Sequence, residues 1–282
     1  MSAQHLLKDQ TVIVTGAATG IGQAFALGCA AQGARVVAAD MNAADDTVQA
    51  IERAGGQALV VRVDVSDAAS VQGMAEAALK AFGRIDGLIN NAAYFREVKL
   101  TPFEEIDPAI WDKIFQVNVK GVWNCCKAVM PAMRRQGSGS IVNIASVVAV
   151  AGQPGYLHYV ATKGAVLSMT KGLAKECGAA NVRVNVIAPG FVITDATSAT
   201  LQAGNLLWIV IKAYLARFGR LFGAEFLNAV EQDADRDDRR DDDEARKLAG
   251  RCRDRGHCCS RRLSYGLNPL RDGLRIDRVD FR

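Results

Sequence analysis

The sequence predicts an α/β fold, a three-layer doubly wound sheet of parallel strands, on the basis of three observations. Residues 11–14 form a β-branched run that leads into a glycine cluster at 16–22, a helix pattern and a second apolar run ending at Asp40. Strand and helix patterns then alternate along the chain, which is typical of a parallel sheet covered by helices. Small or polar residues follow each expected strand, namely Gly16, Asp40, Asp64, Asn90, Ser146 and Pro189. Because ligands of such sheets bind beyond the carboxyl ends of the strands, we expect the functional site there.

Each expected element has its own local signal. The first strand, 11–14, is apolar and β-branched, and the helix pattern of 23–32 stops at Gly33. The second strand covers 34–39, a helix covers 44–54, and the third strand covers 58–63. Ser66 is a suitable cap for a helix that runs to Phe82, and 85–89 is the fourth strand. A long helix is expected over 108–134, a fifth strand over 140–145, a helix containing Tyr159 up to about 177, and a sixth strand over 183–188.

Length and composition exclude several classes of protein. The 282 residues suit one α/β domain, and the net charge of +4, from 34 basic and 30 acidic residues, gives no case for nucleic acid. The first residues lack the apolar run of a signal peptide, and we expect no membrane span. Cysteines 29, 125, 126 and 177 show no paired spacing, so we expect reduced thiols in a cytoplasmic protein and no metal site.

The glycine cluster predicts a site for a dinucleotide. Glycines at 16, 20 and 22 allow a tight turn and the close approach of a diphosphate to the start of the next helix. Asp40 lies eighteen residues after Gly22, near the spacing expected of an acid that binds ribose hydroxyls. A carboxylate repels a 2′-phosphate, and neither Thr19 nor Met41 is basic, so we expect NAD rather than NADP.

A tyrosine and a lysine four residues apart predict proton chemistry. On a helix, Tyr159 and Lys163 share one face, and Ser146 lies thirteen residues upstream of the tyrosine. A fixed positive charge lowers the pKa of a phenol, which suits a group that trades a proton with an alcohol or carbonyl. Taken alone, the same spacing also fits an ordinary Tyr and Lys on a solvated face.

With these motifs, the chain resembles the short-chain dehydrogenase/reductase family over roughly residues 8–195. Five short stretches carry the resemblance: Thr15-Gly16 with Gly20-Ile21-Gly22, Asn90-Asn91-Ala92, Asn118 in N-x-x-G, Ser146 with Tyr159 and Lys163, and Pro189-Gly190 with Thr194. The family has Gly where this chain has Ala93, a small departure close to the cofactor. The resemblance implies a Rossmann fold.

The resemblance also assigns roles to residues. The implied catalytic residues are Asn118, Ser146, Tyr159 and Lys163. The implied cofactor-binding residues are Gly16, Thr19, Gly20, Ile21, Gly22, Asp40, Asp64, Val65, Asn91, Ala92, Tyr159, Lys163, Pro189, Gly190, Val192 and Thr194. In the family Asn118 anchors a water for a proton relay through the lysine, and Asp64 holds the adenine amino group. Asn118 can also be a structural amide within the long helix, and Asp64 a helix-capping acid.

We therefore expect an NAD-dependent oxidoreductase that interconverts a secondary alcohol and a ketone, acting as a homodimer or homotetramer if the C-terminus permits. The residues expected to line the substrate site are mostly apolar and favour a small hydrophobic or aromatic substrate: Tyr94, Phe95, Val147, Val148, Tyr156 and Phe191. One alternative is a 3-oxoacyl-carrier reductase, a role that usually goes with NADP. Another is a catalytically impaired cofactor-binding or scaffold protein.

The C-terminal part departs from the family. We expect a catalytic domain over 1–230 and a charged, disordered tail over 231–282, where 14 basic and 13 acidic residues occur among 52. The segment V-D-G-G, which accompanies the family's seventh strand, is absent from the sequence. One hypothesis is that the chain is read out of frame from a point between about Ala199 and Val230, and the other is a genuine interaction tail.

Overall fold

The computed structural model describes residues 5–190 and 192, and these form a six-stranded parallel sheet with helices on both faces. The strands are β1 (Thr11–Thr15), β2 (Arg35–Asp40), β3 (Gln57–Arg62), β4 (Gly87–Asn90), β5 (Gly139–Ile144) and β6 (Val182–Ile187). The helices are α1 (Gly20–Ala31), α2 (Asp45–Arg53), α3 (Ala68–Phe82), α4 (Pro108–Phe115), α5 (Gly121–Gln136), α6 (Val148–Ala151) and α7 (Leu157–Cys177). Short 3₁₀ turns cover Phe103–Glu105 and Gly178–Ala180. The expected fold class and its six strands are confirmed.

The strand order is β3-β2-β1-β4-β5-β6. The chain adds β2 and β3 on one side of β1 and then returns to add β4, β5 and β6 on the other side, so the order reverses between β1 and β4. Doubly wound sheets bind ligands at the carboxyl ends of the strands where the order reverses, which here are the ends of β1 and β4. Register follows the sequence closely, with Thr15 opposite Asn90 and Asn90 opposite Asn143. The site residues at these strand ends therefore share one edge of the sheet.

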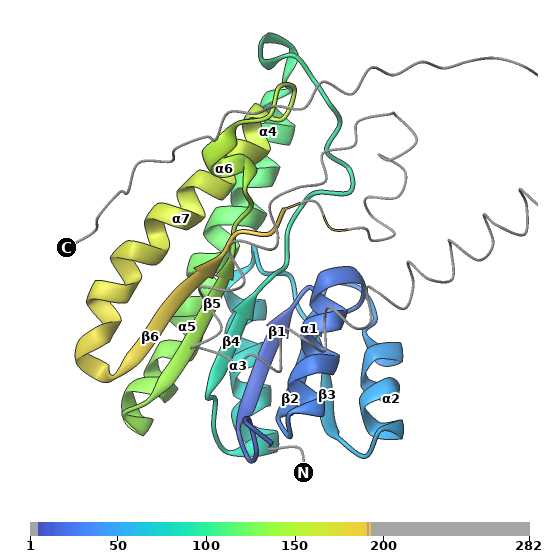
Figure 1. Cartoon of the computed structure of the whole chain (residues 1–282), viewed down its shortest axis with the longest axis vertical. Helices are drawn as coiled ribbons and strands as arrows, with labels where there is room; N and C mark the ends of the chain where they lie inside the picture. Colours follow the sequence, from blue (N-terminus) through green and yellow to red (C-terminus); the bar gives the residue numbers. More distant parts are fainter. Residues whose placement is uncertain (1–4, 191, 193–282) are drawn as a thin grey trace, which may run out of the picture. The chain divides into compact units, whose positions relative to one another are not determined.

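Helices cover both faces of the sheet (Figure 1), and two hydrophobic clusters hold these layers together. The larger lies between the sheet and helices α3, α5 and α7, and it includes the fully buried residues Ile13, Met74 and Val166. The smaller joins the other face to α1 and α2 through residues such as Val36 and Ile51. Strands buried on both faces explain why the sequence shows continuous apolar runs rather than alternation.

Two local features differ from the sequence-based expectation. The long helix expected over 108–134 consists of α4 and α5 joined by a π-helical turn, Gln116–Lys120. An apolar pattern does not encode the shift from i+4 to i+5 hydrogen bonds, so the pattern alone could not show it. The cap of α3 is Asp67, whose side chain accepts a hydrogen bond from the backbone N of Ala69, rather than Ser66. Ser66 instead bonds to Asp64.

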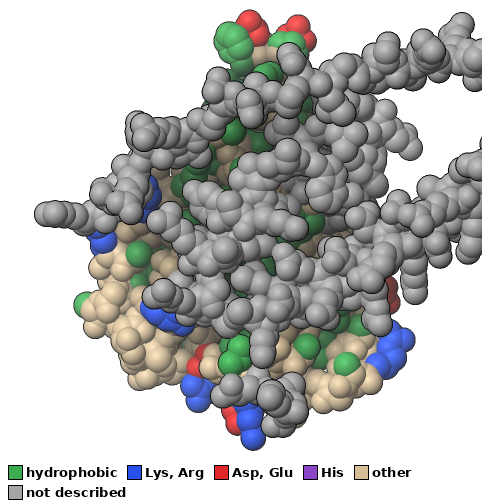
Figure 2. All heavy atoms as spheres, in the orientation of Figure 1, with side chains coloured by type: hydrophobic (Ala, Val, Ile, Leu, Met, Phe, Trp, Pro, Cys, Tyr) green, Lys and Arg blue, Asp and Glu red, His purple; other side chains and the backbone are tan. Residues whose placement is uncertain are grey.

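The described surface shows no gathering of one charge on the face seen in Figure 2, where Lys and Arg side chains lie at separate places. Within the described residues, no helix is long and apolar enough to cross a membrane. Several expectations lie outside the described residues: Phe191, Thr194, the domain boundary at 230, and the charged tail.

Candidate active site

The glycine turn between β1 and α1 forms a cradle that leaves no room for side chains. Gly16 and Gly20 adopt φ angles of +70° and +59°, which favour glycine. A Cβ atom at Gly22 would lie 1.9 Å from the carbonyl oxygen of Gly16. The amide of Asn91 donates to the carbonyl oxygens of Thr15 and Gly16 at 3.1 and 3.2 Å, which ties the turn to the end of β4. This bare backbone at the start of α1 fits the diphosphate of a dinucleotide.

Asp40 ends β2 beside this turn. Its carboxylate accepts hydrogen bonds from the backbone N of Ala18 at 3.0 Å and of Asn42 at 2.9 Å. The structure therefore joins the acid to the glycine turn, as the sequence predicts for a residue that receives the ribose. Thr19 and Ile21 lie on either side of Gly20 at the start of α1.

The segment after β3 contains Asp64 and Val65. The side-chain oxygen of Asp64 accepts hydrogen bonds from the backbone N and the hydroxyl of Ser66, at 2.9 and 2.7 Å. The hydroxyl bond is the main cause that lowers the pKa of Asp64. Asp64 is thus an ionised acceptor that does not cap α3, since Asp67 does so. This geometry suits the expected contact with an adenine amino group.

Asn124 holds this segment in place, a role that sequence reasoning missed. Asn124 lies on α5, is 4% exposed, and donates from its side-chain amide to the carbonyl oxygen of Val65 at 2.9 Å. Gly121, one turn earlier, packs so closely that a Cβ atom there would lie 2.7 Å from a methyl group of Val65. An asparagine inside an apolar helix pattern is the signal that could have found it, because buried amides need partners.

Ser146, Tyr159 and Lys163 come together after β5 and on the first turns of α7. The hydroxyl of Ser146 lies close enough to that of Tyr159 to lower the pKa of the phenol. The ammonium of Lys163 lies 5.6 Å from the centre of the Tyr159 ring and donates to the carbonyl oxygen of Ile144 at 2.8 Å. The structure therefore places all three residues of the predicted triplet in one site.

The acidity of these groups is set mainly by burial. Burial raises the pKa of Tyr159 to about 12, the hydrogen bond from Ser146 lowers it, and the nearby Tyr156 raises it. Burial lowers the pKa of Lys163 to about 8. The sequence predicted that the lysine charge would lower the pKa of the tyrosine. The direction differs because desolvation of the phenol outweighs the other influences.

Asn118 lies in the π-helical turn and connects two parts of the site. Its side-chain oxygen accepts from the backbone N of Tyr94 at 2.7 Å. Its amide group donates to the carbonyl oxygen of Tyr94 and to the hydroxyl of Thr162, each at 3.3 Å. Asn118 therefore acts as a structural amide in this structure. Its hydrogen-bond partners lie in the loop after Ala92 and on helix α7, and not in its own helix as expected.

Aromatic side chains surround Tyr159. Phe95 lies 4.9 Å from Tyr159 and 6.3 Å from Tyr156 between ring centres, and Tyr156 lies 6.3 Å from Tyr159. The carbonyl oxygen of Pro189 accepts from the backbone N of Val147 at 3.0 Å, which places the Pro189-Gly190 segment beside Ser146. Val192 belongs to the described residues and Thr194 does not. No group of three or more His, Cys, Asp or Glu side chains arranged to hold a metal occurs in the part of the chain that the structure describes.

Comparison with known proteins agrees with this architecture. The short chain dehydrogenase family matches residues 10–204. A 3-oxoacyl-[acyl-carrier-protein] reductase FabG of Staphylococcus aureus is 37% identical over 214 residues, 75% of this chain and 85% of the relative. The enzyme of the same name from Thermotoga maritima is 40% identical over 216 residues, 76% of this chain and 86% of the relative.

Solved structures give the same result. A putative short-chain alcohol dehydrogenase from Sinorhizobium meliloti has a TM-score of 0.67 at 32% identity, covering 77% of this chain and 82% of the other. A xylitol dehydrogenase with NAD⁺ bound has a TM-score of 0.62 at 32% identity, covering 66% and 72%. With the strand order, the glycine turn and the Ser-Tyr-Lys cluster in place, these matches show that the chain belongs to the short-chain dehydrogenase family of oxidoreductases.

Proposed function

We propose that the chain interconverts a secondary alcohol and a ketone with NAD(H), with Tyr159 as general acid and base. The observation that carries the proposal is the cluster of Tyr159, Ser146 and Lys163 at the same carboxyl-end edge of the sheet as the glycine turn. A dinucleotide whose diphosphate lay at the turn would supply the hydride, and Tyr159 on α7 would supply the proton.

The residues divide the work in the following way. Bound NADH supplies a hydride to the carbonyl carbon. Tyr159 donates its phenolic proton to the carbonyl oxygen, and the hydroxyl of Ser146 holds that oxygen by a hydrogen bond. In the oxidative direction, the phenolate of Tyr159 accepts the hydroxyl proton of the alcohol, and NAD⁺, when bound, would take the hydride from the carbon. Lys163 places a positive charge near the phenol below its pKa of about 8.

The acidity of Tyr159 favours one direction. With a pKa raised to about 12 by burial, the tyrosine is protonated at neutral pH and is ready to act as an acid. Carbonyl reduction uses this form directly, whereas alcohol oxidation needs the phenolate. We therefore propose that reduction is the faster direction near pH 7.

The choice of NAD rests on Asp40. Both oxygens of this carboxylate accept bonds from backbone N–H groups, one from Ala18 in the glycine turn and one from Asn42, and this attachment to the turn supports Asp40 as the acid that would receive the adenosine ribose. A fixed negative charge at this point repels a 2′-phosphate. The NAD⁺-bound xylitol dehydrogenase with a similar fold supports the same choice.

The substrate is proposed to be small and hydrophobic, because Phe95 and Tyr156 flank Tyr159. Three further residues expected to line the site are half-buried: Tyr94, which precedes Phe95, and Val147 and Val148, which follow Ser146. We also retain two proposals from the sequence: a homodimer or homotetramer, based on the family resemblance, and a cytoplasmic location, based on the cysteine pattern. Nucleic acid and membrane are not among the proposed partners.

A second candidate is the reduction of a 3-oxoacyl thioester. The names of the curated relatives favour it, since FabG proteins from two species match at 37% and 40% identity. Its chemistry needs the same three residues and the same reductive direction. A third reading, a cofactor-binding protein with impaired catalysis, keeps the cradle but predicts no turnover.

Steady-state assays of the purified chain separate these candidates. NADH and NADPH are each tested with aryl and alkyl ketones and with acetoacetyl-coenzyme A, beside Tyr159→Phe as control. The proposal predicts ketone reduction with NADH and a loss of roughly 10²–10⁴ in rate for Tyr159→Phe, with NADH binding retained. Preference for the thioester with NADPH would support the second candidate, and NADH binding without turnover the third.

A further inference from the structure

A row of buried polar side chains crosses the core beneath the active site. It consists of Asn90 at the end of β4, Asn143 on β5 and Thr170 on α7, and we call these three residues the polar row. The amide of Asn90 donates to the side-chain oxygen of Asn143 at 2.8 Å, and the amide of Asn143 donates to the hydroxyl of Thr170 at 2.9 Å. Their exposed fractions are 3%, 0% and 4%, so water does not compete for these bonds.

The direction of the hydrogen bonds in the polar row is fixed by its last member. The hydroxyl of Thr170 has one proton and donates it to the carbonyl oxygen of Val166 at 2.7 Å. Thr170 must therefore accept from Asn143, which turns the amide nitrogen of Asn143 toward the helix and its oxygen toward Asn90. Rotating the Asn143 amide by half a turn would place nitrogen against nitrogen at Asn90, and the hydroxyl of Thr170 would have to give up its bond to Val166 in order to donate to the Asn143 oxygen. Burial then makes each unmade bond costly, so the row holds one arrangement.

Each member of the polar row is close in sequence to a part of the site. Asn90 directly precedes Asn91, which holds the glycine turn. Asn143 lies three residues before Ser146 on the same strand end. Thr170 lies two turns after Lys163 on the helix that carries the catalytic tyrosine. The row thus joins the cofactor turn, the serine and the tyrosine helix through the interior.

A second bond joins the same strand and helix at the site itself. Lys163 donates to the carbonyl oxygen of Ile144, the residue after Asn143. Helix α7 is therefore attached to β5 at two points about two turns, or ~10 Å, apart along the helix axis. Apolar packing of α7 holds the helix against the sheet, and two directional bonds to one strand add a specific position along that strand and a specific rotation.

We propose that Asn143 and Thr170 are positioning residues that set the location of Tyr159 and Lys163 relative to Ser146. The inference rests on the proposed function of these three residues in proton transfer. Neither Asn143 nor Thr170 touches the reacting atoms. Their contribution is to keep α7 from sliding or turning against β5, because a misplacement of about 1 Å in a catalytic group can cost ~10²-fold in rate.

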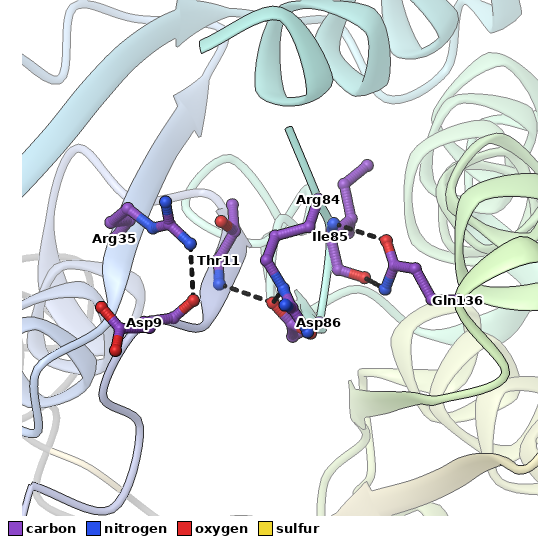
Figure 3. Close-up of polar contacts among 7 residues, drawn as sticks. All are labelled: Asp9, Thr11, Arg35, Arg84, Ile85, Asp86 and Gln136. Carbon is purple, nitrogen blue, oxygen red and sulfur yellow. Dashed lines mark hydrogen bonds and ion pairs between the residues drawn. The ribbon is translucent and has the colours of Figure 1, made fainter. Parts of the chain in front are cut away.

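The test compares variants that remove one bond, restore it, or remove a bond elsewhere. Thr170→Val keeps the shape of the side chain and removes the hydroxyl, whereas Thr170→Ser keeps the hydroxyl. Gln136→Leu is the control (Figure 3). Gln136 on α5 accepts from the backbone N of Ile85 at 3.0 Å and donates to its carbonyl oxygen at 2.8 Å, so it joins helix to strand near the start of β4, at the other edge of the sheet from the site.

We expect Thr170→Val to lower kcat at least about tenfold while the Kd for NADH changes by less than about twofold. Thr170→Ser should recover most of kcat. Gln136→Leu should lower the melting temperature without lowering kcat at 25 °C. The double variant Asn143→Leu/Thr170→Val removes both partners of the strand-to-helix bond but leaves the buried amide of Asn90 without its oxygen acceptor, so it should stay less stable than the wild type and keep the low kcat.

Two results would overturn the inference. The first is a Thr170→Val enzyme with the kcat of the wild type, and the second is a double variant that has the kcat of the wild type although its stability is reduced. If the wild type shows no turnover, the proposed function fails, and hydrogen exchange still tests the attachment of the helix. Thr170→Val should then speed exchange over residues 157–166 relative to Gln136→Leu, and equal exchange in the two variants would refute it.

Discussion

Replacing Gly22 with alanine tests the cofactor cradle directly. The Cβ atom of alanine would lie 1.9 Å from the carbonyl oxygen of Gly16, 2.5 Å from the amide nitrogen of Asn91 and 2.6 Å from the carbonyl carbon of Gly16. Ordinary van der Waals contact begins at 3.4 Å. The nearest atom is a backbone carbonyl oxygen, which cannot rotate away, so the turn must move by about 1.5 Å or α1 must move away from β1.

The expected effect follows from that displacement. Overpacking of this kind costs typically ~1–3 kcal/mol in the free energy of unfolding. The backbone N–H groups of the turn would also move by more than 1 Å from the positions that bind the diphosphate. We expect the Kd for NADH to rise by roughly 10²-fold, as for other misplacements of about this size.

Fluorescence titration with NADH and urea unfolding measure the two effects. Gly73→Ala serves as the matched control, because Gly73 lies on the exposed side of α3 with no atom within 4 Å of a Cβ. That variant should gain roughly 0.5–1 kcal/mol in stability and bind NADH as the wild type does. A Gly22→Ala protein whose Kd for NADH stays within about threefold of the wild type would show that the turn does not hold the diphosphate.

Three further changes test other parts of the site. Asp40→Ala should weaken NADH binding and reduce the preference for NADH over NADPH, measured as the ratio of kcat/KM for the two cofactors. An unchanged ratio would show that Asp40 does not face the ribose. Asn124→Leu should raise the Kd for NADH several-fold through the freed carbonyl of Val65, measured by titration, whereas a wild-type Kd would make Asn124 a purely structural amide. Because the pKa of Lys163 falls from 10.5 to about 8 on folding, the unfolded chain binds more protons between these values, and stability contributed by this group rises with pH there. We compare the free energy of unfolding of the wild type with that of Lys163→Met, measured by urea titration. The difference should shift in favour of the wild type by up to roughly 3 kcal/mol as the pH rises from 8 to 10.5. A difference that stays constant with pH would contradict this.

Most of the fold could be predicted from the sequence because its signals are local. Each strand is a short apolar run, and each ends at a glycine or polar residue that the sheet brings to one edge. The π-helical turn at Gln116–Lys120 could not be predicted this way. It depends on a hydrogen-bond partner five residues back, and apolar residues near a period of 3.6 do not distinguish it from continuous helix.

The candidate site divides along the same line. The glycine turn, Asp40 and the Ser146-Tyr159-Lys163 cluster were predicted from spacing, and the structure brings them to one edge of the sheet. Asn124 and the polar row were missed, since their partners lie far away in sequence: 59 residues separate Asn124 from Val65, and 53 separate Asn90 from Asn143. A buried amide indicates that a hydrogen-bond partner exists, but only the fold shows which residue it is.

The acidity of Tyr159 shows why residue type and spacing do not settle chemistry. Spacing places a lysine beside the phenol, and charge alone would then lower the pKa of the tyrosine. The structure buries both groups, which raises the pKa of Tyr159 to about 12 and lowers that of Lys163 to about 8. Both shifts disfavour the charged pair of phenolate and ammonium, so below about pH 8 the stable form is a neutral phenol beside an ammonium. That form can donate a proton to a carbonyl, whereas alcohol oxidation needs the phenolate, so the burial of the pair supports the proposed preference for reduction near pH 7.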